Sequence, residues 1–223
     1  MATFQKMREN MISGQFLPGL VKNEKLLEVF NEIDREKYLP NNTKHMAYSD
    51  VHIKLENQRY SISPFTLAKI IETANILAKD VVMIIAAGTG YESAIISKIA
   101  GAVVATEESS TLFNQAEENL KNNFAENIIN INCSHFLGLK KHAPYDKIII
   151  LGSVIKPPKE IISQLAKNGK LLSCENYDDN LEESKLFIYN KVGNKIFREY
   201  VCDLNLPKLD LNTKENDIFN FER

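Results

Sequence analysis

The chain has 223 residues, of which 44% are apolar and 25% charged, and its net charge is −2. This length favours one α/β domain with an appendage over two full domains. A charge so near zero provides no general attraction to nucleic acid or to an anionic membrane. Because every apolar run is also too short to span a bilayer, we expect neither nucleic acid nor a membrane among the partners.

The cysteines indicate a reducing compartment. Cys133, Cys174 and Cys202 are odd in number and lack the spacing of metal ligands. Such residues are typical of free thiols in the cytosol. The first ten residues lack the apolar core of a signal peptide. We therefore expect a cytoplasmic protein without a metal site, and favour a monomer.

Residues 1–66 predict a helical extension followed by a substrate-side loop. Apolar residues at helical spacing indicate one helix before Pro18-Gly19 and a second that stops before Pro40. Residues 44–66 predict an ordered loop that is rich in hydroxyl groups. Ser63 before Pro64 has the character of an N-cap for a helix from Phe65 to about Leu77.

The most informative stretch lies at residues 81–91. Five apolar residues, Val81 to Ile85, predict a strand buried on both faces and hence parallel to its neighbours. Gly88-Thr89-Gly90 then forms a tight turn, and a helix begins at Tyr91. Strand, turn and helix make half of a βαβ unit, whose turn offers backbone N–H groups to a ligand.

A carboxylate follows the second predicted strand. Val103–Thr106 leads directly into Glu107, and a carboxylate in that place can accept hydrogen bonds from ribose hydroxyls. We infer a nucleoside-containing cofactor across the carboxyl ends of these two strands. The alternative is a turn that serves only close packing, since Ala86 stands where the dinucleotide fingerprint has its first glycine.

The remaining pattern predicts an open α/β sheet with right-handed crossovers. Two closely spaced strands around Val192-Gly193-Asn194 predict a terminal antiparallel hairpin. We assign residues 67–207 to a Rossmann-like domain and residues 208–223 to a polar tail. The other predicted elements are a helix at 112–120, strands at 127–131, 147–151 and 170–174, and a helix at 159–166 that residues 167–169 cap.

Residues 5–207 resemble the protein-L-isoaspartate O-methyltransferase family. The segments that carry the resemblance, in the family's order, are Val29–Pro40, Ala47-Tyr48-Ser49-Asp50, Ser61-Ile62-Ser63-Pro64, Ala87–Tyr91 and Ala143-Pro144-Tyr145-Asp146. The resemblance implies the seven-strand sheet of S-adenosylmethionine-dependent methyltransferases, mostly parallel, with a C-terminal antiparallel hairpin and helices on both faces.

The resemblance also implies an activity: methyl esterification of isoaspartyl residues in damaged proteins, with S-adenosyl-L-methionine as cofactor and a protein or peptide as substrate. It implies that Ser61 or Ser63 orients the substrate carboxylate and that Glu107 holds the ribose. The other residues it assigns to cofactor binding are Gly88, Thr89, Gly90 and Tyr91 in the turn, and Ser134 and His135 after the third strand, where a partly exposed loop histidine is expected.

The chain departs from the family pattern at several positions. Ile84 and Ala86 replace an acidic residue and a glycine, and Ser134 replaces the aspartate near the adenine. Each lost carboxylate removes hydrogen bonds worth roughly 1.5–3 kcal/mol. Aligned on Pro64 without a gap, the family's threonine and serine fall on Tyr60 and Ile62, and a shift of one residue is needed to bring Ser61 and Ser63 into their place.

Two alternatives stay open. The departures favour a non-catalytic relative that has lost cofactor binding and acts as a binding or interaction module. An NAD-dependent dehydrogenase would have the same order of strand, turn and helix. It has less support, because the turn has two of the three fingerprint glycines and the terminal hairpin favours a methyltransferase.

Overall fold

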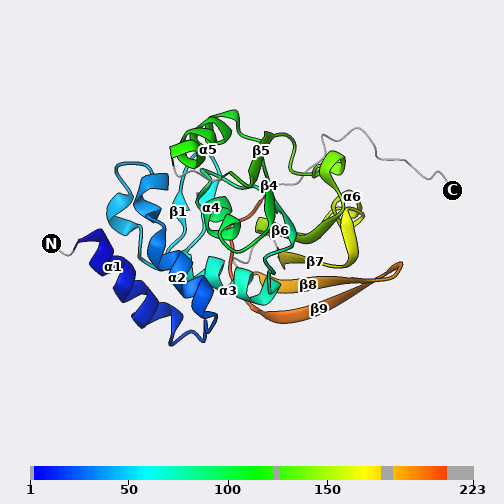
Figure 1. Cartoon of the computed structure of the whole chain (residues 1–223), viewed down its shortest axis with the longest axis horizontal. Helices are drawn as coiled ribbons and strands as arrows, with labels where there is room; N and C mark the ends of the chain where they lie inside the picture. The colour runs from blue at the N-terminus through cyan, green and yellow to red at the C-terminus, as the bar shows by residue number, and fades with distance from the viewer. Residues whose placement is uncertain (1–2, 123–125, 177–182, 210–223) are drawn as a thin grey trace.

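The protein is built on a seven-stranded sheet in the order β5-β4-β3-β6-β7-β8-β9 (Figure 1). The computed structural model describes residues 3–122, 126–176 and 183–209. Strands β3 to β7 are parallel, and β8 runs antiparallel to both β7 and β9. The strands are β3 (Val81–Ile85), β4 (Ala102–Glu107), β5 (Ile128–Asn132), β6 (Tyr145–Val154), β7 (Leu165–Glu175), β8 (Lys185–Val192) and β9 (Lys195–Asp203).

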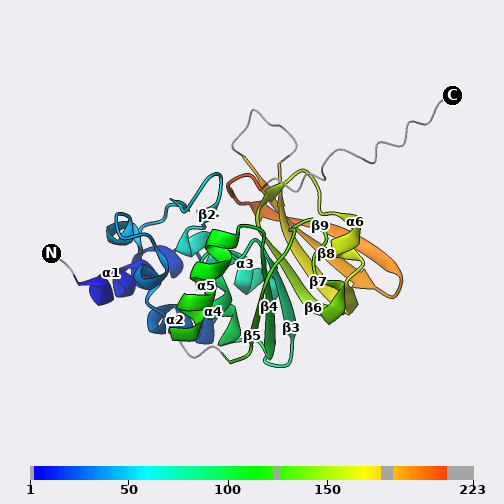
Figure 2. The same cartoon turned by 90° about the horizontal axis from the view of Figure 1, so that it is seen from above.

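Helices cover both faces of the sheet unequally. Figure 2 shows α3 (Pro64–Ala74), α4 (Tyr91–Ser97) and α5 (Ser110–Asn122) on one face and the short α6 (Lys159–Ile162) on the other. Successive residues of β3 enter different cores: Val82 and Ile84 pack on the first face, Met83 and Ile85 on the second. An unbroken apolar run therefore does mark a strand buried on both sides. The predicted seven-strand Rossmann-like fold is confirmed.

The N-terminal segment packs outside α3 and α4 and shares their core. Phe16 and Phe30 meet edge to face with ring centroids 4.9 Å apart, within the range of favourable aromatic pairs. The segment comprises α1 (Phe4–Met11), the π-helical η1 (Ile12–Phe16), α2 (Glu24–Glu32) and the 3-10 turns η2 (Arg35–Tyr38) and η3 (Lys44–Met46).

A two-stranded hairpin, β1 (Ile53–Lys54) with β2 (Tyr60–Ser61), stands apart from the main sheet. It leads directly into α3, whose N-cap is Ser63, as the sequence predicts: the Ser63 side chain accepts a hydrogen bond from the backbone N–H of Thr66. The hairpin therefore connects the N-terminal segment to α3.

The predicted helix at 159–166 is wrong in its second half. The α-helix ends at Ile162, and residues 165–169 belong to β7, where Leu165 pairs with Tyr145. Asn168 has a φ of 65°, and a Cβ at Gly169 would lie 2.9 Å from the carbonyl oxygen of Tyr145. The Asn-Gly pair thus forms an irregularity within the strand rather than a helix cap.

The start of the predicted tail is ordered and contacts β6. The backbone N–H of Ser153 donates to the carbonyl of Pro207, and the N–H of Leu209 donates to the carbonyl of Ser153. Leu209 is buried in the second core. Residues 210–223 lie outside the described residues.

Two negative findings apply to the described ranges. No helix there has the length and apolar character needed to cross a membrane. Nor do three or more His, Cys, Asp or Glu side chains gather there in a group able to hold a metal ion.

Strand β9 forms the outer edge of the sheet. Ile196, Phe197 and Tyr200 are 39%, 53% and 51% exposed along it. A register shift between Leu186 and Phe187 interrupts the pairing of β8 with β9.

Arg35 connects the N-terminal segment to the hairpin. Its side chain is fully buried; Nη1 donates to the carbonyl of Ala47 (2.9 Å), and Nη2 donates to Ser61 Oγ (3.1 Å) and to the carbonyl of Ile62 (2.7 Å). The planar fork of a guanidinium carries donors on separate nitrogens in a fixed geometry, so it reaches acceptors spread over two segments that the single nitrogen of an ammonium group cannot contact in the same positions.

We therefore expect Arg35→Lys to lower the free energy of unfolding by about 3 kcal/mol, because a buried charge loses part of its hydrogen bonding. Urea denaturation measures the effect. Lys37→Gln, which removes a partner of Asp34 in an exposed ion pair, is the control and should lose less than about 1 kcal/mol. Similar losses in the two variants would contradict the anchoring role of Arg35.

Candidate functional site at the carboxyl ends of β3 and β4

The turn between β3 and α4 is held against β4. The carbonyl of Thr106 accepts hydrogen bonds from the N–H groups of Ala86 (2.9 Å) and Ala87 (3.0 Å). Ala86 has a φ of 67°, and Gly88 and Gly90 have φ values of 58° and 92°. Glycine adopts this left-handed region freely, whereas alanine there costs roughly 1–2 kcal/mol.

Both glycines also make close contacts that a side chain would obstruct. A Cβ at Gly90 would lie 3.1 Å from Cγ of Leu120 in α5, and one at Gly88 would lie 3.3 Å from Cδ1 of Leu55 in the hairpin. The packing role that the sequence left open is therefore present. Close backbone approach serves a ligand role as well as a packing role.

Glu107 lies at the end of β4, and its side chain is fully buried. Its Oε2 accepts hydrogen bonds from the backbone N–H of Gly88 (2.8 Å) and from Arg59 Nη2 (2.9 Å). Its Oε1 accepts one from the N–H of Ser109 (3.1 Å) and lies 3.3 Å from His135 Nε2. The carboxylate thus contacts four segments of the chain.

These contacts keep Glu107 ionised. Burial by itself raises the pKa of the carboxyl, but the hydrogen bond with His135 and the charge of Arg59 outweigh it, so that the pKa of Glu107 falls to about 2. His135 Nε2 also lies 2.9 Å from the N–H of Glu108. Nε2 donates to Glu107 when it carries a hydrogen and accepts from the N–H of Glu108 when it does not. Arg59 is the partner whose charge is constant.

Arg59 was not among the residues that the sequence singled out. It stands at the end of the hairpin turn, and its Nη2 also donates to the carbonyl of Ala86 (2.8 Å). A second contact joins the hairpin to the same edge: the hydroxyl of Ser109 donates to Glu56. A lone arginine beside the hydroxyl-rich loop, with one carboxylate at the end of an apolar strand, was the signal that could have suggested the pair.

The two candidate catalytic serines lie where the hairpin leads into α3. Ser61 Oγ accepts from Arg35 and donates to Oε1 of Glu92 (3.2 Å). Ser63 Oγ caps α3 and donates to the hydroxyl of Thr66 (2.9 Å). Both serines are almost inaccessible to solvent, at 2% and 3% exposure.

Glu92 is a second residue that sequence reasoning missed. It lies in the first turn of α4, and its complete burial raises the pKa of its carboxyl, although its own backbone N–H and the charge of Arg35 act in the opposite direction. Glu92 is the one acidic residue in the mostly apolar stretch 91–99, and this was the signal in the sequence that could have indicated it. Glu92 and Arg35 hold the Ser61 hydroxyl between them.

The remaining residues that were predicted to bind the cofactor differ in burial and in what they contact. Thr89 is buried in the turn, whereas the ring of Tyr91 packs in the core against Phe30 and Tyr38, away from a ligand at the turn. Ser134 is exposed. His135 is 3% exposed, so the partly exposed position expected for it is wrong: its ring lies between Glu107 and Glu108, whose polar groups compensate its burial.

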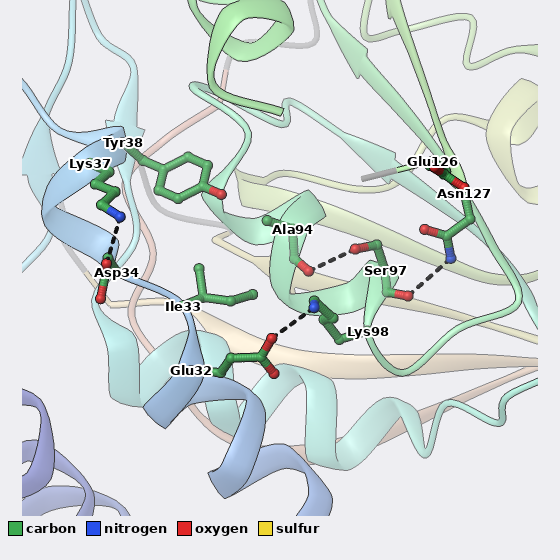
Figure 3. Close-up of a pocket in the computed structure, with 10 residues that line it drawn as sticks. All are labelled: Glu32, Ile33, Asp34, Lys37, Tyr38, Ala94, Ser97, Lys98, Glu126 and Asn127. Atoms are coloured by element: carbon green, nitrogen blue, oxygen red, sulfur yellow. Dashed lines mark hydrogen bonds and ion pairs between the residues drawn. The ribbon is translucent and has the colours of Figure 1, made fainter. Parts of the chain in front are cut away.

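A separate pocket of about 370 Å³ opens at the opposite end of α4 (Figure 3). The hydroxyl of Tyr38 points into it, and the ion pairs Lys37–Asp34 and Lys98–Glu32 lie at its wall. None of the predicted site residues lines this pocket. We therefore place the candidate site at the glycine turn, where the charges and the backbone donors converge.

The strand order, the glycine turn after the first parallel strand and the carboxylate at the end of the second define a protein of the methyltransferase class with a Rossmann-like sheet. The chain belongs to the protein-L-isoaspartate(D-aspartate) O-methyltransferase family, whose model matches residues 6–201. A Helicobacter pylori protein-L-isoaspartate O-methyltransferase is 31% identical over 186 residues, which cover 83% of this chain and 88% of that protein. A Synechococcus protein of the same name is 27% identical over 169 residues, covering 76% of this chain and 69% of that one.

Solved structures agree on the fold. A protein-L-isoaspartate O-methyltransferase superposes with a TM-score of 0.80 at 22% identity, covering 91% of this chain and 66% of that protein. A Plasmodium falciparum protein, described as a candidate protein-L-isoaspartate O-methyltransferase in complex with S-adenosyl-L-homocysteine, has a TM-score of 0.79 at 19% identity, covering 95% of this chain and 100% of that one. The resemblance inferred from short sequence segments is confirmed.

Comparing Ala86→Gly with Ala87→Gly tests the strain in the turn. Each change removes a buried methyl group and frees the unfolded chain, which together cost roughly 1.5 kcal/mol. Ala86→Gly also relieves the left-handed backbone, so we expect its stability to stay within about 0.5 kcal/mol of the wild type. Ala87→Gly should lose the full amount. Equal losses in urea denaturation would show that Ala86 is unstrained.

The depressed pKa of Glu107 predicts a pH dependence of stability. Because the folded-state pKa of about 2 lies below the unfolded value of about 4.3, the contribution of Glu107 is complete above pH ~4.3 and is lost as the pH falls towards 2. The loss is on the order of 3 kcal/mol. We expect the stability difference between wild type and Glu107→Gln to shrink over this range in urea titrations. A constant difference would contradict the prediction.

Proposed function

We propose that this protein is an S-adenosylmethionine-dependent methyltransferase that esterifies the side-chain carboxylate of isoaspartyl residues in damaged proteins. The observation that carries the proposal is the placement of Glu107: a buried carboxylate at the end of β4, hydrogen bonded to the Gly88 N–H of the glycine turn. Membership of the family over residues 6–201 supports the same substrate class.

The donor and acceptor groups have the chemistry that the cofactor requires. Glu107 would accept hydrogen bonds from the ribose hydroxyls, the Gly88–Gly90 turn would hold the methionine part, and Ser134 and His135 would face the adenine. In the described arrangement, however, the acceptor positions of Glu107 already have partners. The residue types fit the cofactor, and one of these contacts has to be exchanged for it.

The reaction makes modest demands on the protein. The sulfonium cofactor supplies the methyl group, and the accepting carboxylate is ionised at neutral pH, so a strong general base is unnecessary. The protein has to orient the carboxylate. Ser61 would supply the orienting donor: the hydrogen bond that it accepts from Arg35 polarises its hydroxyl, and the hydroxyl proton, which is donated to Glu92 in the described arrangement, would have to be redirected to the substrate carboxylate.

The second candidate is a non-catalytic member of the family that binds a partner. The departures at Ile84, Ala86 and Ser134 favour it, as does the ion pair of Arg59 with Glu107. A dehydrogenase, the third alternative, has no comparable support, since the chain belongs to a methyltransferase family. We also propose a cytoplasmic location, which the free cysteines support.

The proposal is tested with radiolabelled cofactor and a matched pair of peptides, one containing isoaspartate and one aspartate. We expect base-labile methyl ester on the isoaspartyl peptide only. Ser61→Ala should lower kcat at least tenfold by removing an orienting donor, and Ser134→Ala, at an exposed position, should have a smaller effect. Saturable cofactor binding without transfer to either peptide would favour the non-catalytic alternative.

A further inference from the structure

Three contacts place the β1–β2 hairpin over the site. Leu55 lies against Gly88, Glu56 bonds with Ser109, and Arg59 bonds with Glu107. All three involve the edge where a nucleoside cofactor would lie under the proposed function. Figure 2 shows β2, the second strand of the hairpin, at the same end of the sheet as the carboxyl ends of the parallel strands.

The donors to Glu107 differ in how they are attached. The N–H groups of Gly88 and Ser109 belong to the turn after β3 and to the residues just before α5, both built on the main sheet. Arg59 belongs to the hairpin, which shares no strand pairing with that sheet. A carboxylate has about four acceptor positions, and the two backbone donors, Arg59 and His135 leave little capacity for a ribose diol.

We propose that Arg59 is an internal competitor of the cofactor: its guanidinium closes the hairpin onto Glu107 and has to leave before the ribose can bind there. The proposal rests on the proposed function. Because Arg59 is the charged donor that the separate hairpin carries, it is the partner that can be exchanged without disturbing β3, β4 or α5. The apparent affinity for cofactor is then reduced by the fraction of molecules in which the hairpin is closed.

The same geometry explains how one residue can set this balance. Arg59 Nη2 bridges the Glu107 carboxylate and the Ala86 carbonyl, with distances of 2.9 and 2.8 Å. Its side chain is largely buried, at 14% exposure, so its hydrogen bonds are little screened by solvent. Removing the guanidinium frees one acceptor position on Oε2 of Glu107 and leaves the two backbone donors in place.

The test is calorimetric titration of the full-length protein with S-adenosyl-L-homocysteine, comparing wild type with Arg59→Gln. Lys54→Gln, an exposed lysine on the same hairpin, is the charge-matched control. We expect Arg59→Gln to bind at least tenfold more tightly than the wild type, and Lys54→Gln to bind as the wild type does. Amide hydrogen exchange supplies a second readout: residues 53–61 should exchange faster in Arg59→Gln alone, with the rest of the protein unchanged.

The outcomes separate this proposal from the proposed function. Equal affinity and equal exchange in all three proteins would overturn the competition and leave the methyltransferase proposal standing. An absence of binding in all three, Arg59→Gln included, would overturn both the competition and the cofactor assignment. Tighter binding by Arg59→Gln without methyl transfer to the isoaspartyl peptide would support the competition and contradict the proposed substrate.

Discussion

The buried carboxylate of Glu107 is the constraint on which the site depends. A charge removed from water has to be compensated by hydrogen-bond donors and by opposite charge. Glu107 obtains them from segments far apart in the sequence: the glycine turn through Gly88, the start of α5 through Ser109, and the hairpin through Arg59. Parallel strands whose carboxyl ends share one edge make this convergence possible. In this way the Glu107 side chain connects the glycine turn, the start of α5 and the hairpin.

The hairpin is held by two arginines of different character. Arg35 is completely buried and binds the Ser61 end through backbone carbonyls and a hydroxyl, so the contact joins it to the N-terminal segment. Arg59 is part of the hairpin and joins it to the main sheet through the Glu107 carboxylate and the carbonyl of Ala86 in the glycine turn. The first contact is distributed over several acceptors and is part of the core. The second is concentrated on Glu107, where a ligand can replace it.

The sequence predicted the features that depend on local pattern. The apolar run of β3, the capping role of Ser63 and the place of Glu107 at a strand end follow from periodicity and residue type, and the structure has them. It could not predict contacts between distant segments. The pairing of Arg59 with Glu107 spans 48 residues, and the burial of His135 depends on the same cluster. The false helix at 163–166 arose because pairing with β6 overrides local preference.

The exposed edge of β9 bears on how molecules of this protein meet one another. An edge strand offers unpaired backbone groups to a strand of another chain, and apolar side chains such as Phe197 and Tyr200 strengthen that tendency. Charged neighbours on the same strand, Lys195 and Glu199, and the irregular pairing at Leu186 oppose it, since charge and local twist disfavour flat stacking of sheets. We therefore expect the tendency of this edge to pair with another chain to depend on a few side chains along β9, which are separate from the site at β3 and β4.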